Sequence, residues 1–117
     1  MNPPKAFSDC YQLSIQVFHR TKNYPKHLRP TLAKKLEEST IRALLEIKKA
    51  SVTRHNIRKN HLTQASFAMD DVKTLIQLSK DMHALNASGF SELIKMAKEI
   101  GKELGGLIKY ESAQKNC

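Results

Sequence analysis

The residues best suited to chemistry lie in one short basic segment, residues 53–61, which reads TRHNIRKNH. It holds three permanent cations and two histidines around a single apolar side chain, Ile57. Guanidinium and ammonium groups donate hydrogen bonds to phosphate and carboxylate oxygens, so the chemistry that this segment offers is the binding of an anion. The alternative is an ordinary solvated corner between two helices.

Two of these cations lie where a helix more often carries acids. If Asn56 caps a helix that begins at Ile57, then Arg58 and Lys59 occupy its first turn. The helix dipole disfavours cations there by roughly 0.3 to 1 kcal/mol. A bound phosphate would offset this, because helix N-termini and neighbouring basic side chains both attract phosphate. Arg54 suits the end of the preceding helix.

A basic stripe leads to this segment. Lys35, Arg42 and Lys49 recur every seven residues, so a helix would align them along one side, and Lys34 and Lys48 flank them. The alternative is a solvated face in which Glu38 pairs with cations four residues away. The residues from which we expect contacts to nucleic-acid backbones are Lys34, Lys35, Arg42, Lys49, Arg54, Arg58 and Lys59.

The net charge is confined to one half of the chain. The formal charge is +9; residues 1–64 contain 13 Lys and Arg against 4 Asp and Glu, whereas residues 65–117 contain 7 of each. A one-sided positive field attracts polyanions, of which nucleic acid is the commonest in cytoplasm. We do not expect a membrane partner, because no segment combines bulky apolar residues with these cations on one amphipathic helix.

The sequence lacks the patterns that are typical of catalysis or metal binding. No histidine has another histidine or a carboxylate at the i, i+3 or i+4 spacing of a metal site on a helix. Asp70 and Asp71 are adjacent and therefore diverge on a helix. No phosphate-binding glycine loop or serine-nucleophile motif is present. We expect no catalytic residues, no metal, no cofactor and no enzymatic activity.

The remaining composition indicates a cytoplasmic protein. Apolar runs such as residues 43–45 are far shorter than the roughly 20 residues of a membrane-spanning helix. The opening MNPPKAFSDC lacks the apolar core of a secretion signal. Cys10 and Cys117 lie near opposite ends without CxxC spacing, so we expect free thiols.

The elements that position these residues are predicted to be four helices of one domain. The length of 117 residues suits one domain, and the low Gly and Pro content favours helices. Hydrophobic spacing predicts helices at about residues 9–22, 26–53, 57–85 and 89–111. Ser8, Asn56 and Ser88 are the expected N-caps. Short connections then favour an all-α, antiparallel up-and-down four-helix bundle.

Each predicted helix has an expected inner face. These faces are Tyr11, Ile15 and Phe18 in the first helix; Leu32, Leu36, Ala43, Leu44 and Ile47 in the second; Leu62, Ala65, Met69, Val72, Leu75, Ile76 and Met82 in the third; and Phe90, Leu93, Ile94, Ala97, Ile100, Leu104 and Leu107 or Ile108 in the fourth.

Three glycines interrupt the fourth predicted helix: Gly101, Gly105 and Gly106. Each disfavours the helix by about 1 kcal/mol relative to Ala. Gly101 and Gly105 share a face, so we expect that a neighbouring helix or subunit packs closely there. The alternative is that Gly105 and Gly106 end the helix as a C-terminal cap.

The chain resembles a known bacterial four-helix bundle family over residues 11–110. The most specific part is EIGKELGGLIKY, residues 99–110, supported by Pro25 before the second helix and by the core segment of residues 43–47. This family includes proteins encoded in ribosomal RNA intervening sequences and, more similar to this chain, the accessory variability determinant of diversity-generating retroelements. Leu107 stands where related sequences often carry Trp.

The resemblance implies a non-enzymatic homopentameric barrel of four-helix bundles. Its positive surface would bind the retroelement's reverse transcriptase, template RNA and cDNA, and so support mutagenic cDNA synthesis and retrohoming, while the glycines would serve tight packing. The alternative is a protein-interaction bundle of the ribosomal RNA intervening-sequence type, whose basic face meets an acidic protein surface.

Overall fold

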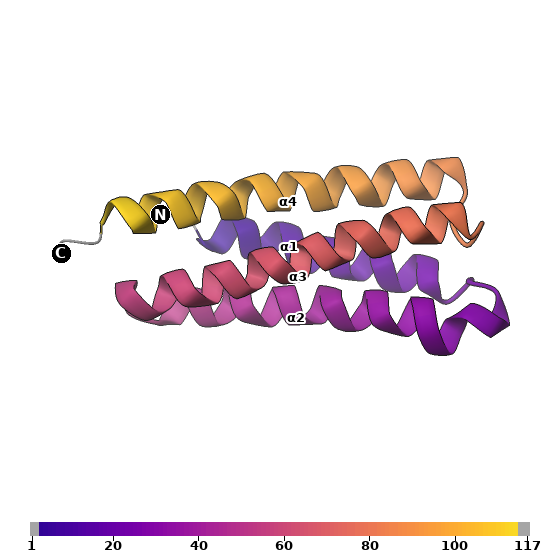
Figure 1. The fold of residues 1–117 in the computed structure, drawn as a ribbon, viewed down its shortest axis with the longest axis horizontal. Helices are drawn as coiled ribbons and strands as arrows, with labels where there is room; N and C mark the ends of the chain where they lie inside the picture. Colours follow the sequence, from indigo (N-terminus) through magenta and orange to yellow (C-terminus); the bar gives the residue numbers. More distant parts are fainter. Residues whose placement is uncertain (1–2, 115–117) are drawn as a thin grey trace.

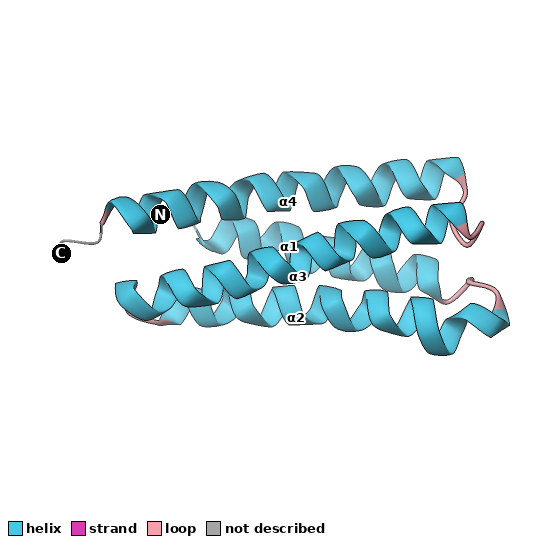
Figure 2. Ribbon diagram, in the orientation of Figure 1, coloured by secondary structure: helices cyan, strands magenta, loops and turns pink. Residues whose placement is uncertain are grey.

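The protein is a bundle of four long helices, shown by a computed structural model that describes residues 3–114 (Figure 1). The helices are α1 (Pro3–Thr21), α2 (Lys34–Val52), α3 (His55–Asp81) and α4 (Ala87–Ala113). No strand occurs within residues 3–114, as Figure 2 also shows. The predicted all-helical class is therefore confirmed.

Consecutive helices run in opposite directions and pack side by side around one core (Figure 1). α1 packs on α2 and α4, and α3 also packs on α2 and α4, so α1 and α3 lie at diagonal positions. The bundle measures 51 × 22 × 19 Å. One end carries the α1–α2 connection and the α3–α4 turn, and the other carries the α2–α3 turn.

The predicted inner face of α1 is wrong. Tyr11, Ile15 and Phe18 are exposed, and Tyr11 keeps 50% of its surface accessible. The residues that fill the core from α1 are instead Ala6, Cys10, Leu13 and Val17. Both sets have helical spacing, so α1 is apolar on two sides. The side with the smaller side chains packs into the core, and the side that carries Tyr11 and Phe18 faces outward.

The expected inner faces of the other helices are largely confirmed. The predicted core positions of α3 and α4 that are buried are Leu62, Ala65, Met69, Val72, Ile76, Leu93, Ala97, Ile100 and Leu104. Met82 is an error, because α3 ends at Asp81 instead of continuing to residue 85, and Met82 keeps 48% of its surface exposed. Beyond the helix end a residue no longer follows the helical stripe.

All three predicted N-caps are wrong. Ser8 lies inside α1, which begins at Pro3, where proline is accepted because the first helical N–H groups have no partner within the helix. The N-cap of α3 is Arg54 rather than Asn56, and it makes no side-chain capping bond. In α4, Asn86 Oδ1 accepts a hydrogen bond from the Gly89 N–H at 2.7 Å, which is the role predicted for Ser88.

The second helix begins irregularly. A short 3₁₀ helix (Lys26–Leu28) leads into a π-helical turn (Arg29–Ala33), and the regular helix α2 starts only at Lys34. Pro30 explains this delay, since it has no N–H to enter the α-helical hydrogen-bond pattern. π-helical turns are rare in proteins, and those that occur are often found at functional sites.

Cys10 is a free, buried thiol, as expected, and Cys117 lies outside the described residues. Burial raises the pKa of the Cys10 thiol to about 12, so this side chain is an unreactive part of the core. None of the helices in residues 3–114 is long and apolar enough to cross a bilayer.

Candidate nucleic-acid interface

The predicted basic stripe lies on the outer side of α2. Lys34, Lys35, Arg42 and Lys49 are all exposed. Lys49 Nζ lies 3.6 Å from a Glu46 oxygen, and Arg42 Nη2 donates to Gln64 Oε1 at 3.2 Å. The side chains of Lys34 and Lys35 make no hydrogen bond or ion pair with residues 3–114. The first two cations of the stripe thus form no ion pair within the described residues, although Glu37 and Glu38 follow them closely in the chain.

The Arg58 side chain makes its contacts within the protein. Its Nε donates to the Ala50 carbonyl at 3.2 Å and its Nη2 to the Thr53 carbonyl at 2.9 Å, which satisfies backbone oxygens at the end of α2. Its Nη1 lies 3.5 Å from Glu111 Oε2. The acidic partner of this cation is therefore a carboxylate from α4, and the expected phosphate is not needed to explain its position.

Glu111 is the residue that sequence reasoning missed at this end. Its side chain is 1% exposed and also lies 2.5 Å from Nδ1 of His55, the first residue of α3. The first turn of α3 contains no acid of its own, so Glu111 supplies the negative charge that a helix N-terminus favours. One signal was available: Glu111 falls seven residues after Leu104, on the apolar stripe of α4.

A second histidine–carboxylate contact joins α2 to α3 near the same turn. His61 Nδ1 lies 2.8 Å from Glu46 Oε1, and both side chains are mostly buried. Glu46 is also the partner of Lys49. The sequence rule for metal pairs could not find this contact, because the two residues belong to different helices. No group of histidine, cysteine and acidic residues within the described part of the chain is arranged to hold a metal ion.

The two remaining cations of the turn face solvent. Arg54 and Lys59 are exposed, and their side chains make no hydrogen bond or ion pair within residues 3–114. The α2–α3 turn therefore brings together Arg54, Arg58 and Lys59 as predicted, but only Arg54 and Lys59 remain available to an external anion.

A separate ionic cluster ties α1 to α4. Lys5 Nζ donates to Asp9 Oδ2 at 2.9 Å and to Glu103 Oε2 at 3.0 Å. A hydrogen bond from Glu103, and then the one from Lys5, holds the pKa of Asp9 below its usual value. Burial, followed by the hydrogen bond to Asp9, raises the pKa of Glu103. The hydrogen bonds to Asp9 and Glu103 raise the pKa of Lys5. The cluster crosslinks two helices through charge.

Three of the four glycines of α4, Gly101, Gly105 and Gly106, do not serve packing between helices of the same chain. A methyl group placed on Gly105 or Gly106 would meet no atom within 4 Å, and one on Gly101 would meet only the end of the Lys73 side chain at 3.3 Å. The capping alternative is wrong, because α4 continues to Ala113. Close approach by another subunit stays a prediction. The tightly packed glycine is Gly89, whose methyl would lie 3.2 Å from Arg20.

Comparison with known proteins adds a family and a fold. The profile of the bAvd-like family matches residues 8–111. A crystal structure of a protein with unknown function from the S23 ribosomal protein family of Bacteroides thetaiotaomicron superposes with a TM-score of 0.82 at 14% identity, covering 93% of this chain and 99% of that one. No functionally curated protein matches the sequence. Since the family profile spans nearly all of the four-helix bundle, this chain belongs to the bAvd-like family.

Proposed function

We propose that this protein is a non-enzymatic accessory protein of a diversity-generating retroelement, which binds the reverse transcriptase, template RNA and cDNA to support mutagenic cDNA synthesis. The observation that carries the proposal is the row of exposed cations on α2, in which Lys34 and Lys35 contact no acid of residues 3–114. Membership of the bAvd-like family supports the same role. Contacts of this kind neutralise phosphates, so binding is tolerant of sequence and weakens with salt.

Charge reversal on α2 tests the nucleic-acid part of this proposal. Lys34→Glu, Lys35→Glu and Arg42→Glu in one variant should weaken binding of a labelled single-stranded RNA at least about tenfold at about 50 mM salt. The matched control changes three exposed lysines of α4, Lys95, Lys102 and Lys109, to Glu.

Both variants change the net charge equally, so only the position of the charge differs. Fluorescence anisotropy at about 50 and 200 mM salt measures the affinity and its salt dependence. Equal affinities for the α2 variant and the α4 control would contradict a specific role for the α2 cations.

Two exposed apolar grooves support self-assembly as the second part of the proposal. The groove between α1 and α2 has a volume of about 510 Å³ and is lined by Tyr11, Ile15, Phe18 and Ile41. A groove of similar volume lies between α3 and α4, with Leu78, Phe90 and Ile94 in its lining. Since each groove lies between a different pair of adjacent helices, the two are on opposite sides of the bundle.

Two different apolar faces on opposite sides favour head-to-tail association, which closes into a ring when the rotation permits. We propose the homopentamer on this basis and on the family resemblance. Light scattering should give five times the chain mass of 13.3 kDa. Phe18→Glu should dissociate the assembly, whereas Phe67→Glu, which changes a still more exposed phenylalanine outside both grooves, should not. A wild-type protein that stays monomeric at micromolar concentration contradicts the ring.

The second candidate function is a protein-interaction bundle without a nucleic-acid role. The fold shared with a protein of the S23 ribosomal protein family and the two apolar grooves favour it. In this case the basic face of α2 meets an acidic protein. A wild-type protein that binds no RNA at low salt, but co-purifies with an acidic protein in a manner that the α2 variant abolishes, would favour this candidate.

A further inference from the structure

The end of the bundle that carries the α1–α2 connection is basic and free of acids over a long stretch. Residues 10–36 contain no Asp or Glu. The cations in this stretch are Arg20, Lys22, Lys26, Arg29, Lys34 and Lys35. They come from the last turn of α1, the connection, the π-helical turn and the first turn of α2. The proposed contacts on α2 and at the α2–α3 turn include none of the first four.

Most of these cations are available to an external anion. Lys22 and Lys26 are exposed, and their side chains make no hydrogen bond or ion pair with residues 3–114. Arg29 donates its Nε–H to the Tyr24 carbonyl at 3.0 Å, and its terminal nitrogens contact no acceptor among residues 3–114. Arg20 alone is paired, with Glu92 of α4 at 3.0 Å.

The backbone that carries the free cations is held firmly by apolar and polar contacts. Tyr24 is 1% exposed and Leu28 is 9% exposed, so the connection is anchored into the core on both sides of Pro25. Thr21 Oγ1 donates to Glu37 Oε2 at 2.6 Å, which fastens the end of α1 to α2. Because the connection is already ordered, an anion that binds there loses less free energy to the ordering of a loop.

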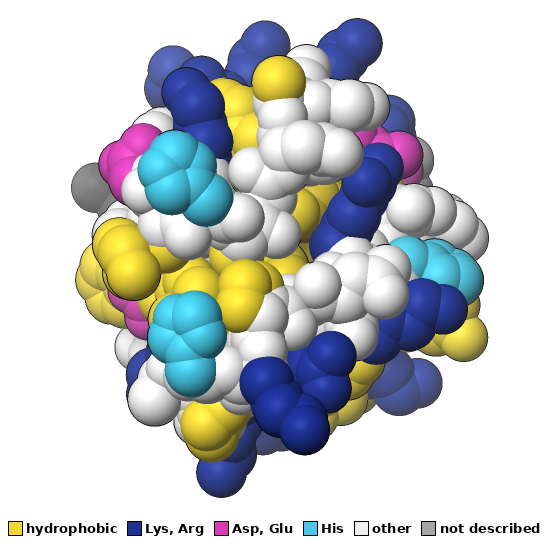
Figure 3. Space-filling model, turned by 90° about the vertical axis from the view of Figure 1, so that its right-hand side faces the viewer, with side chains coloured by type: hydrophobic (Ala, Val, Ile, Leu, Met, Phe, Trp, Pro, Cys, Tyr) yellow, Lys and Arg dark blue, Asp and Glu magenta, His cyan; other side chains and the backbone are white. Residues whose placement is uncertain are grey.

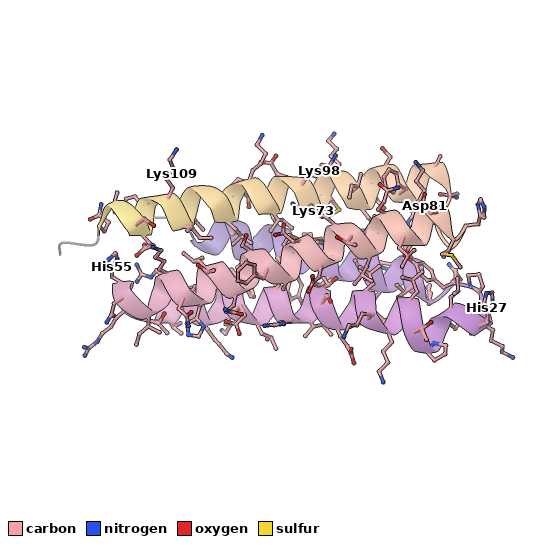
Figure 4. The ribbon with its side chains drawn as sticks, viewed as in Figure 1. His27, His55, Lys73, Asp81, Lys98 and Lys109 are labelled. Atoms are coloured by element: carbon pink, nitrogen blue, oxygen red, sulfur yellow. The ribbon has the colours of Figure 1, made fainter. Side chains whose placement is uncertain are left out.

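The α3–α4 turn adds a histidine to the same end, after the exposed Asp81. Figure 3 views this end directly and shows many Lys, Arg and His side chains around its edge, with fewer acidic side chains among them and hydrophobic side chains toward the centre. His27 projects from the tip of the connection (Figure 4). His83, just after α3, is also exposed. Imidazole rings can donate hydrogen bonds to phosphates and stack on unpaired bases.

We propose that this end is a second polyanion site, which takes the phosphate backbone of single-stranded RNA and passes it onto the α2 stripe through Lys34 and Lys35. The inference rests on the proposed nucleic-acid function. A single strand fits because it can curve around an end about 20 Å wide, whereas a duplex is stiff over about 150 base pairs. A lipid surface fits poorly, because the large apolar residues of the connection, Tyr24 and Leu28, are buried.

The test compares three double variants that each remove two exposed lysine or arginine charges. The end variant is Lys22→Gln with Lys26→Gln, the turn variant is Arg54→Gln with Lys59→Gln, and the control on α4 is Lys102→Gln with Lys109→Gln. The probe is a labelled oligouridine of about 20 nucleotides, long enough for several phosphate contacts. Circular dichroism verifies that each variant keeps the wild-type unfolding midpoint, as expected for exposed positions.

The end variant should bind the oligouridine about tenfold more weakly than the wild type at about 0.1 M salt. The slope of log affinity against log salt should also become shallower by about 1.4, because each of the two lost phosphate contacts contributes about 0.7. The turn variant should lose no more than this, and the α4 control should match the wild type. An end variant that binds like the wild type, while the turn variant binds weakly, overturns this inference and leaves the proposed function intact.

Two other outcomes separate the remaining explanations. If the wild-type protein binds no oligouridine at low salt, the proposed nucleic-acid function fails together with this inference. If the end variant loses binding to vesicles that contain phosphatidylserine, but keeps its affinity for oligouridine, the end is a lipid site and the inference is wrong.

Discussion

At the α2–α3 end of the bundle several cations and histidines meet acids, although Arg54 and Lys59 do not. At the α1–α2 end, Arg20 is the one cation of residues 10–36 that meets an acid among residues 3–114. Glu111 holds His55 and Arg58, and Glu46 holds Lys49 and His61. His55 and His27 mark the two ends in Figure 4. Near His27, the connection is ordered by burial of Tyr24. Dense positive charge in a sequence therefore does not establish that the charge is available, because buried acids can neutralise it.

The strongest test of this difference removes the apolar anchor of the α1–α2 end. Tyr24→Ala should lower the free energy of unfolding by about 3 to 5 kcal/mol, because it empties a fully buried aromatic site. Tyr110→Ala is the matched control at the opposite end, where Tyr110 is 47% exposed, and should change the free energy far less. Urea unfolding measures both. Similar losses for the two variants would mean that the connection is not anchored by Tyr24.

The next largest effect should come from the acid that neutralises the α2–α3 end. Glu111→Ala leaves Arg58 and His55 without their shared carboxylate and should cost about 2 to 3 kcal/mol of unfolding free energy, less than for a fully buried pair because both partners are partly exposed. Glu99→Ala, at an exposed position of α4, should stay within about 0.5 kcal/mol of the wild type. A Glu111→Ala protein with wild-type stability would contradict the conclusion that Glu111 stabilises this end by neutralising Arg58 and His55.

A pair of neighbouring cations separates internal from external use of charge. Arg58→Met should lower the unfolding free energy by about 1 to 2 kcal/mol, since it removes hydrogen bonds to two backbone carbonyls and to Glu111. Lys59→Met should leave stability within about 0.5 kcal/mol but weaken RNA binding. Thermal unfolding and anisotropy give the two readouts. If Lys59→Met destabilises the protein more than Arg58→Met does, the internal role given to Arg58 and the external role given to Lys59 are wrong.

The smallest expected effect lies at the α1–α2 end and is a gain of stability. His83 has a φ of 62°, a left-handed conformation that suits glycine after a helix. His83→Gly should raise the unfolding free energy by about 0.5 to 1 kcal/mol, because glycine has no Cβ penalty there. His27→Gly, at a position without positive φ, should instead be neutral or destabilising. A loss of stability in His83→Gly would show that the imidazole makes a stabilising contribution.

The sequence by itself determined the number, type and approximate extent of the helices. Apolar residues that recur every three or four positions can be buried only if the segment is helical, so the stripes of α3 and α4 were readable without a structure. The glycine-rich ending of α4 also carried the family resemblance. The difference in net charge between the two halves of the chain also follows directly from the residue counts.

Only the tertiary structure decided which side of a helix faces inward and which cations are neutralised. α1 has two apolar stripes, and periodicity cannot choose between Leu13 with Val17 and Ile15 with Phe18, because both fit a helix equally well. The contact between Arg58 and Glu111 could not be predicted from the sequence either, because the two residues are 53 positions apart in the chain. Spacing along one helix predicts contacts between neighbours on that helix, whereas contacts between helices depend on how the bundle packs.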